Sequence, residues 1–265
     1  MDFELQASER SRKSPTSRKN HPRLRTLATI GTVRDPASST RRTRRTSMPT
    51  PEHRAVDPAE LPWSSTTTSG VDEKQLAASC FQDPSRTTLV RLGSSAEWQP
   101  TSATEGAEVF VLEGTWRTSR GALRAGGYAR LAPGQVSSTS SPNGCVLFVK
   151  SGPFAASDRD EVHLQSSEEP WLPGHGNLRV KSLSPLESRG AALVFWPASE
   201  RFVRHQHCGG EEILVLSGEF RDEHGRYPAG TWIQSAHLSV HHPFVMEETV
   251  IFVKTGHLQL ESNSA

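Results

Sequence analysis

The stretch "RHQHCGGEEILVLSGEF" brings together side chains that can bind a metal ion. His205 and His207 are separated by one residue, and Glu211 follows after two glycines. Because successive side chains of a strand point to opposite faces, these three residues, which share parity, are expected on one face. Glycine allows the backbone between them to bend without a steric penalty. Imidazole and carboxylate ligands favour zinc, iron, manganese, nickel or copper over calcium or magnesium.

An isolated His-x-His pair is a weak signal, because hydrogen-bonded surface histidines can produce it. Whether the pair binds a metal or consists of surface histidines therefore has to be judged from the residues around it. If these side chains are buried without an ion, their polar atoms lack partners, which costs a few kcal/mol. A bound ion would offset that cost.

The surrounding region occurs twice in the chain. With a shift of 104 residues, "VLEG" (111–114) aligns with "VLSG" (215–218), and "LFVK" (147–150) aligns with "IFVK" (251–254). The same shift aligns three pairs of glycines: Gly114 with Gly218, Gly121 with Gly225, and Gly126 with Gly230. This period is too long for a solenoid repeat, so the sequence predicts a duplicated domain.

Each copy reads as a series of short strands. Segments rich in Val, Ile, Leu and Phe are separated by Gly, Pro and Ser, and no long segment has helical periodicity. "EFRDEHGRY" predicts a hairpin with His224 and Gly225 at its turn, and "TWRTSRGAL" predicts another with Arg120 and Gly121 there. Glycine would supply the positive φ of a tight turn. The expected fold class is all-β, as a sandwich or barrel in each copy.

The motifs of the second copy resemble those of a known family. His205-x-His207-x3-Glu211-x6-Gly218 resembles the first cupin motif, and "YPAGTWIQSAHLSVHHP" resembles the second, with His241 two residues before a proline. The wording "HxHxGGEExLVLxGxFxDExGxYxxG" is similar to the ChrR-type cupins, named for the C-terminal domain of an anti-sigma factor. The resemblance covers about residues 56–260 and is stronger in the second copy.

This resemblance implies two tandem jelly-roll barrels and one metal centre. The implied ligands are His205, His207, Glu211 and His241, which would hold one divalent transition ion. Zinc and iron are the leading candidates, and manganese and nickel are alternatives. Glu211 is also the candidate catalytic residue, as a base that leaves the metal when substrate binds. Pairing of such barrels through their sheets would give a homodimer.

The first copy lacks this ligand set. The 104-residue shift places non-ligand residues opposite all four positions: Thr101, Ala103, Ala107 and Ser137. The first barrel is therefore expected to be metal-free and to support the second.

Neighbouring residues receive other roles. Glu212 aligns with Glu108, which remains where the ligands are lost, so Glu212 is expected to be structural. We expect His237 to be a loop residue rather than a fifth ligand, His242 to be solvated, and Cys208 to face away from the metal. Three aromatic residues are expected in the barrel core, with one lining a substrate pocket as the alternative: Trp196, Phe202 and Trp232.

Charge divides the chain unevenly. Residues 1–49 hold 12 Lys and Arg against 4 Asp and Glu, whereas the whole chain has a net charge of +1. We predict a disordered basic tail (1–55), a degenerate metal-free cupin (56–153) and a metal-binding cupin (154–261). "RRTRR" could bind nucleic acid or a membrane surface. An unstructured leader without a partner, or a start at Met48, is the preferred interpretation, so neither partner is expected.

Three scattered cysteines and the lack of a signal peptide or apolar span predict a cytoplasmic protein. The resemblance favours a metal-dependent oxygenase-type enzyme acting on a small diketone or phenolic substrate, similar in outline to diketone-cleaving dioxygenases. An octahedral ion would keep two open positions, whereas these four ligands would saturate a tetrahedral zinc. The alternatives are a metal- or redox-responsive regulatory cupin, and a barrel that binds a sugar or metabolite without chemistry. A strict anti-sigma role is not expected, because residues 1–55 contain no cysteine for a zinc domain.

Overall fold

The computed structural model describes residues 53–78, 85–100, 106–134, 138–152, 161–184 and 190–258. In these ranges the regular elements are strands and two 3-10 turns, η1 (Pro58–Glu60) and η2 (Ser166–Glu168), which confirms the all-β prediction. No helix of the described part is long and apolar enough to cross a membrane. Most of the predicted tail, residues 1–52, lies outside the described residues.

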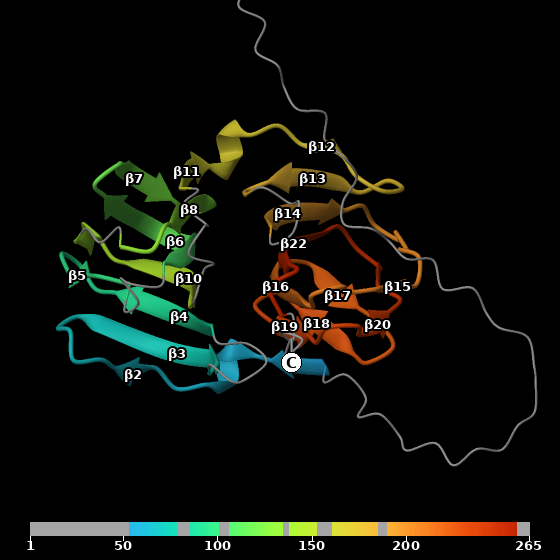
Figure 1. Ribbon diagram of the computed structural model, residues 1–265, viewed down its shortest axis with the longest axis horizontal. Helices are drawn as coiled ribbons and strands as arrows, with labels where there is room; N and C mark the ends of the chain where they lie inside the picture. The colour runs from blue at the N-terminus through green and yellow to red at the C-terminus, as the bar shows by residue number, and fades with distance from the viewer. Residues whose placement is uncertain are drawn as a thin grey trace, which may run out of the picture.

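The strands form two barrels side by side, with the N-terminal half of the chain in one and the C-terminal half in the other (Figure 1). The first barrel is a ten-stranded sheet: β2 (Ser64–Ser65), β3 (Val71–Ala77), β4 (Arg86–Leu92), β5 (Glu97–Trp98), β6 (Ala107–Thr118), β7 (Gly121–Arg124), β8 (Gly127–Leu131), β9 (Thr139–Ser140), β10 (Cys145–Ser151) and β11 (Val162–Gln165).

The second barrel combines a seven-stranded sheet with two small ones. The large sheet contains β1 (His53–Val56), β12 (Leu172–Pro173), β13 (Arg179–Ser182), β14 (Ala191–Trp196), β16 (Glu211–Ser217), β19 (Trp232–Ser235) and β22 (Thr249–Thr255). The small sheets pair β15 (His205–Gln206) with β20 (Val240–His241), and β17 (Glu219–Arg221) with β18 (Arg226–Pro228) and β21 (Phe244–Val245).

The strand orders of the two main sheets confirm the duplication. One runs β11-β8-β6-β10-β4-β3-β2 and the other runs β1-β19-β16-β22-β14-β13-β12. Gly114 and Gly218, which the 104-residue shift aligns, both have positive φ, +75° and +74°. A Cβ atom at either position would collide with a backbone carbonyl, of Gly144 or Glu248, so both copies need glycine there.

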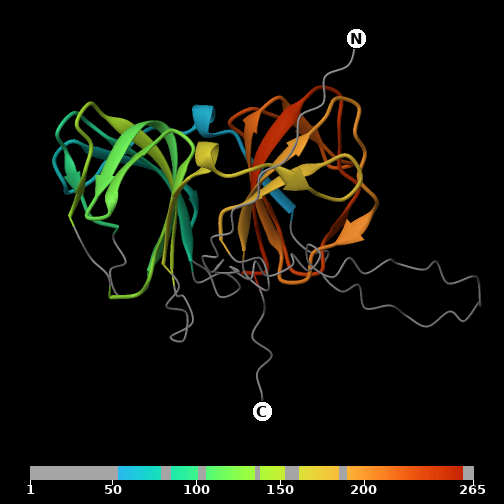
Figure 2. The same cartoon turned by 90° about the horizontal axis from the view of Figure 1, so that it is seen from above.

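The two barrels exchange one strand each. β1 precedes the first barrel in the sequence but pairs antiparallel with β19 of the second, and β11 precedes the second but pairs with β8 of the first. Figure 2 shows β1, in blue, beside the orange barrel. Both strands depart from the predicted domain boundaries. Residues 53–55, which were predicted to belong to the tail, form part of β1 in the second barrel. β11, which lies within the predicted second domain, pairs with the first barrel.

Alternation along the strands separates three apolar clusters. One fills the first barrel around Trp98 and Trp116, and a second fills the other barrel around Trp196 and Phe220. The third lies between the barrels, where Phe252 packs against rings of the first barrel. In strand β16, odd positions face the barrel interior and even positions face the other barrel.

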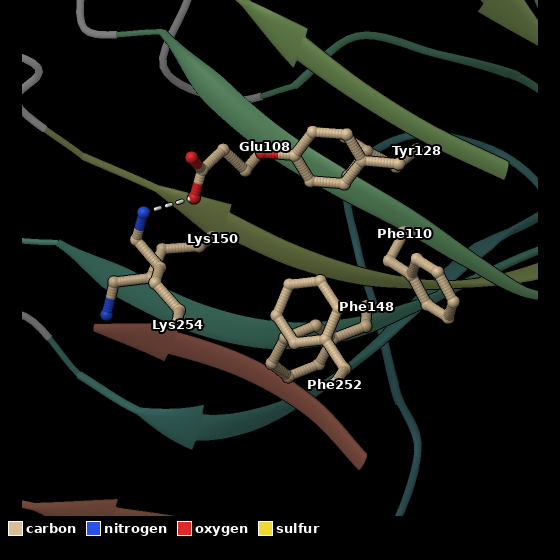
Figure 3. Close-up of a pocket in the computed structure, with 8 residues that line it drawn as sticks. Glu108, Phe110, Tyr128, Phe148, Lys150, Phe252 and Lys254 are labelled. Atoms are coloured by element: carbon tan, nitrogen blue, oxygen red, sulfur yellow. Dashed lines mark ion pairs between the residues drawn. The ribbon is translucent and has the colours of Figure 1, made fainter. Parts of the chain in front are cut away.

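Buried charges also join the barrels, and they are related by the same duplication. Figure 3 shows Glu108 of the first barrel paired with Lys254 of the second, with Nζ and Oε2 2.6 Å apart. Reciprocally, Lys150 Nζ lies 3.0 Å from Glu212 Oε2. Burial opposes ionisation of Glu212, but the charges of Lys150 and His257 outweigh it and lower its pKa. Glu212 thus has a structural role, as predicted, and this role is an ion pair that joins the two barrels.

Candidate metal centre

Three histidines meet at one end of the second barrel. Strand pairing places His205 directly opposite His241, and His207 follows two residues after His205. The distances between ring centroids are 4.7 Å for His205 and His207, 4.8 Å for His205 and His241, and 4.6 Å for His207 and His241. One nitrogen from each ring lies within 4.8 Å of the others. Among the described residues, this is the one group of three or more possible ligands that gather so closely.

The two glycines after these histidines allow the chain to return to the site. Gly209 and Gly210 have φ values of +84° and +70°, in the left-handed region that favours glycine. A Cβ atom would come within 2.6 Å of Gly256 Cα at the first position and of Leu258 Cβ at the second. This compact turn leads directly into β16, whose first residue is Glu211.

Glu211 points to the histidines from the barrel interior. Its Oε2 atom lies 3.6 Å from His207 Nε2 and 3.8 Å from His241 Nε2. The carboxylate, His207 and His241 are all buried, whereas His205 is half-buried. The structure thus brings all four predicted ligand side chains together.

Burial strongly affects the protonation of these groups. Together with repulsion by His241, it lowers the pKa of His205 to about 4 and that of His207 to about 2. Burial also raises the pKa of Glu211 to about 7. For His241, burial is outweighed by the hydrogen bond with Asp222 and the charge of Glu211, so its pKa is raised. Two neutral imidazoles are therefore ready to donate lone pairs at neutral pH.

The donor atoms of this cluster fit a cation. His207 Nε2 and Glu211 Oε2 are buried and have no hydrogen-bond partner in the described part of the chain. His205 Nδ1 lies 2.9 Å from the Val203 carbonyl oxygen, and His241 Nδ1 lies 3.2 Å from Asp222 Oδ2. Because each Nδ1 then carries the proton, each Nε2 keeps its lone pair for a metal. Three imidazoles and one carboxylate suit a divalent transition ion.

Asp222 was not among the residues predicted from the sequence. It follows β17, and its Oδ1 accepts hydrogen bonds from the backbone N–H of His224, at 2.8 Å, and of Gly225, at 3.1 Å. These bonds shape the predicted hairpin turn, but Gly225 does not have the positive φ expected of it. The residue of the first copy that aligns with Asp222 is Thr118. This difference between the copies is the sequence signal that could have identified Asp222.

The neighbouring residues mostly occupy their expected places. His237 Nδ1 accepts a hydrogen bond from the Gly209 N–H at 2.7 Å, so that nitrogen is already used. His242 and Cys208 are exposed. Trp196 lies in the core of the second barrel, but the equally buried Trp232 belongs to the cluster between the barrels.

Phe202 borders the candidate site. Its ring centroid lies 4.8 Å from that of His205, and it packs against the core of the second barrel. In the first barrel, the residue that aligns with Glu211 is Ala107, which is buried. The counterparts of the histidines (Thr101, Ala103 and Ser137) lie outside the described residues.

Comparisons with known proteins agree with this architecture. The family model described as "ChrR Cupin-like domain" matches twice, at residues 51–155 and 159–259. No curated protein matches the sequence.

Solved structures share the fold at low sequence identity. YlbA from E. coli is 18% identical, with a TM-score of 0.65 over 82% of this chain and 96% of that chain. A provisionally named dioxygenase from Nostoc punctiforme is 13% identical, with a TM-score of 0.67 over 82% and 86%. Oxalate decarboxylase from Bacillus subtilis, described with Mn(II) centres, is 10% identical, with a TM-score of 0.55 over 77% of each chain.

Proposed function

The chain belongs to the ChrR Cupin-like domain family, and from this premise we propose that it is a metal-dependent oxygenase-type enzyme. The proposed ligands are His205, His207, Glu211 and His241, and zinc or iron is the leading ion, with manganese or nickel as alternatives. The observation that carries the proposal is the buried Oε2 of Glu211, which has no hydrogen-bond partner among the described residues and faces imidazole nitrogens at 3.6 and 3.8 Å. A cation between these atoms would satisfy all of them at once.

A bound divalent ion would supply Lewis acidity and, if it is iron, redox chemistry with dioxygen. Glu211 contributes a proton acceptor to this site. Without an ion, burial raises the pKa of its carboxyl group to about 7, and the charge of a bound ion would lower this pKa, so Glu211 would act as a carboxylate base once it leaves the ion. We propose that Oε2 accepts the proton of an enol or phenol hydroxyl when the substrate binds. Asp222 keeps His241 in one tautomer during this exchange.

Apolar side chains around the histidines support an apolar or aromatic substrate rather than a sugar. Phe202 contacts His205, and Val203 and Leu238 are large apolar residues that are 46% and 45% exposed. The backbone of both residues lies beside the cluster, since the Val203 carbonyl oxygen contacts the His205 ring and the Leu238 N–H donates to the His207 carbonyl oxygen. A planar diketone or phenolic compound could bind here through its oxygens and cover this apolar rim.

A regulatory cupin is the second candidate function. The family description, which names ChrR, favours it. A partner protein recovered at equal stoichiometry in a pull-down, and released when the metal is removed, would support this function over catalysis. The predicted homodimer also stays a prediction, which analytical ultracentrifugation can check.

Elemental analysis tests the metal centre first. Protein purified without added metal should contain about one transition ion per chain. His205→Ala should lose the ion, whereas His242→Ala, which changes an exposed neighbour of a proposed ligand, should retain it. An ion content near zero in the wild type, or equal content in both variants, would contradict the proposed centre.

Oxygen consumption then tests the enzyme. Iron-loaded protein should consume dioxygen in the presence of at least one member of a panel of small diketones and catechols. The enzymatic proposal fails if no compound of the panel causes consumption above that of the His205→Ala variant.

A further inference from the structure

A histidine from the N-terminal strand reaches the surroundings of the metal centre. His53 is the first residue of β1, and strand pairing places it opposite Ser235 of β19. Its Nε2 lies 2.8 Å from Tyr227 Oη, and its Nδ1 lies 3.2 Å from Ser235 Oγ. The ring also stacks on His224, with the centroids 4.6 Å apart. Strand pairing and three side-chain contacts with the second barrel thus hold a residue from the far end of the sequence.

The hydrogen bonds from His53 continue to a proposed metal ligand. Tyr227 Oη lies 3.0 Å from Asp222 Oδ1, and Asp222 Oδ2 lies 3.2 Å from His241 Nδ1. All of these side chains are at least half-buried, and Asp222 and Tyr227 are buried. The two bonds on Asp222, from Tyr227 and from His241, are buried, and this environment strengthens them.

Chemistry fixes the direction of every bond in this path. An ionised carboxylate can only accept, so Tyr227 and His241 both donate to Asp222. Because the Tyr227 hydroxyl proton is used in this way, its oxygen must accept from His53 Nε2–H. His53 Nδ1 then accepts from the Ser235 hydroxyl. The donor series from His53 through Tyr227 thus ends on Asp222, and this carboxylate also accepts from His241, the imidazole whose Nε2 faces the ion site.

We propose that His53 is a positioning residue of the metal centre, acting through Tyr227 and Asp222 to orient His241. This inference rests on the proposed function, because it needs a bound ion. The metal centre of the second barrel is then completed by a strand that belongs, by sequence, to the other half of the chain.

The first barrel argues against a purely structural role for this path. The 104-residue shift aligns Asp222, Tyr227 and Ser235 with Thr118, Leu123 and Leu131 of the first barrel. These three residues cannot form the same hydrogen-bonded path. The exchanged strand β11 also carries a histidine, His163, whose Nε2 lies 3.1 Å from Thr118 Oγ1. The first barrel, which lacks the proposed ligands, therefore also receives an exchanged strand with a histidine. It does not have the residues that would link this histidine to a metal site.

Cobalt(II) binding to the full-length protein provides the test, with affinity measured by competition with a chelator and geometry by the visible absorption spectrum. His53→Leu should weaken binding by about tenfold and alter the spectrum, as loss of groups behind metal ligands does. His53→Gln, whose amide can still donate to Tyr227, should recover most of the affinity. Tyr227→Phe should resemble His53→Leu. His163→Leu is the matched control and should leave both affinity and spectrum unchanged.

The outcomes separate this inference from the proposed function. If the wild type binds no more cobalt than His205→Ala, the metal centre itself is refuted. If the wild type binds cobalt and His53→Leu matches it in affinity and spectrum, the positioning role is refuted. Equal weakening by His53→Leu and His163→Leu without spectral change would also refute it, because only stability would then be affected. If His53→Leu does not fold, the pair His53→Gln and Tyr227→Phe decides.

Discussion

The two barrels have the same strand order but different interiors. Inside the second barrel, Glu211 and His241 approach each other, whereas the position of Glu211 in the first barrel is the buried Ala107. On the surfaces that join the barrels, both copies keep a glutamate and a lysine, which pair across the interface in a reciprocal manner. The faces between the barrels thus preserve the assembly, while the interior of one barrel provides the candidate metal site.

This difference extends beyond the ligands. The polar path behind His241 is replaced by apolar or short side chains in the first barrel, where Leu123 lies in the core. A metal site needs both the atoms that bind the ion and the groups that orient them. Comparison of aligned positions therefore identifies both sets within one chain.

Removal of a proposed ligand gives the largest expected effect. His207→Ala removes a buried imidazole whose Nε2 has no hydrogen-bond partner in the part of the chain that the structure describes, so bound metal should fall from about one ion per chain to none. Inductively coupled plasma mass spectrometry measures this content. Retention of the ion by this variant would remove the distinction between the two barrels.

Both reciprocal ion pairs should contribute to stability. Lys150→Met and Lys254→Met each leave a buried glutamate without its main partner, which costs about 3–5 kcal/mol in the free energy of unfolding. Urea denaturation of the metal-free protein gives this quantity. A large loss in one variant and none in the other would show that only one of the pairs holds the barrels together.

Aligned residues behind the ligands should differ in their effect on metal affinity. Asp222→Asn weakens the hold on His241 and should lower the affinity by about 10- to 100-fold. Thr118→Val, the aligned change in the first barrel, should have no effect. Chelator competition measures both, and similar affinities for the two variants would contradict the assigned role of Asp222.

Acid should weaken the interface between the barrels. The pKa of Glu212 is lower in the folded protein than its ordinary value of 4.5, so its contribution to stability is complete above that value and decreases as the pH falls below it. From about pH 5 to about pH 3, the wild type should lose more unfolding free energy than Glu212→Gln, which lacks this titration. Parallel losses, followed by urea denaturation of metal-free protein, would exclude this contribution.

Much of the architecture could be predicted from local patterns. The aligned glycines predicted the duplication because the backbone at Gly114 and Gly218 cannot accommodate a side chain. Strand parity suggested that His205, His207 and Glu211 share one side, and the alignment of Glu212 with Glu108, which remains where the ligands are lost, marked Glu212 as structural. These inferences depend on spacing within one copy or on the alignment between the two copies, and both can be read directly from the sequence.

The exchange of strands could not be predicted in this way. β1 has four residues, and nothing in its own sequence specifies which barrel it joins, since that depends on contacts with residues more than 170 positions away. His53 was consequently assigned to the basic tail. Gly225 shows a similar limit, because the side chain of Asp222 shapes the turn and glycine's conformational freedom is not used there.

The most direct measurement is an anomalous difference map from crystals of the full-length protein, collected at the absorption edge of the ion that it retains. The account predicts a single strong peak at about 2.0–2.2 Å from the nitrogen or oxygen atoms of His205, His207, Glu211 and His241. A peak beside Ala107 in the first barrel, or a map in which the His241 imidazole lies away from the ion, would contradict it.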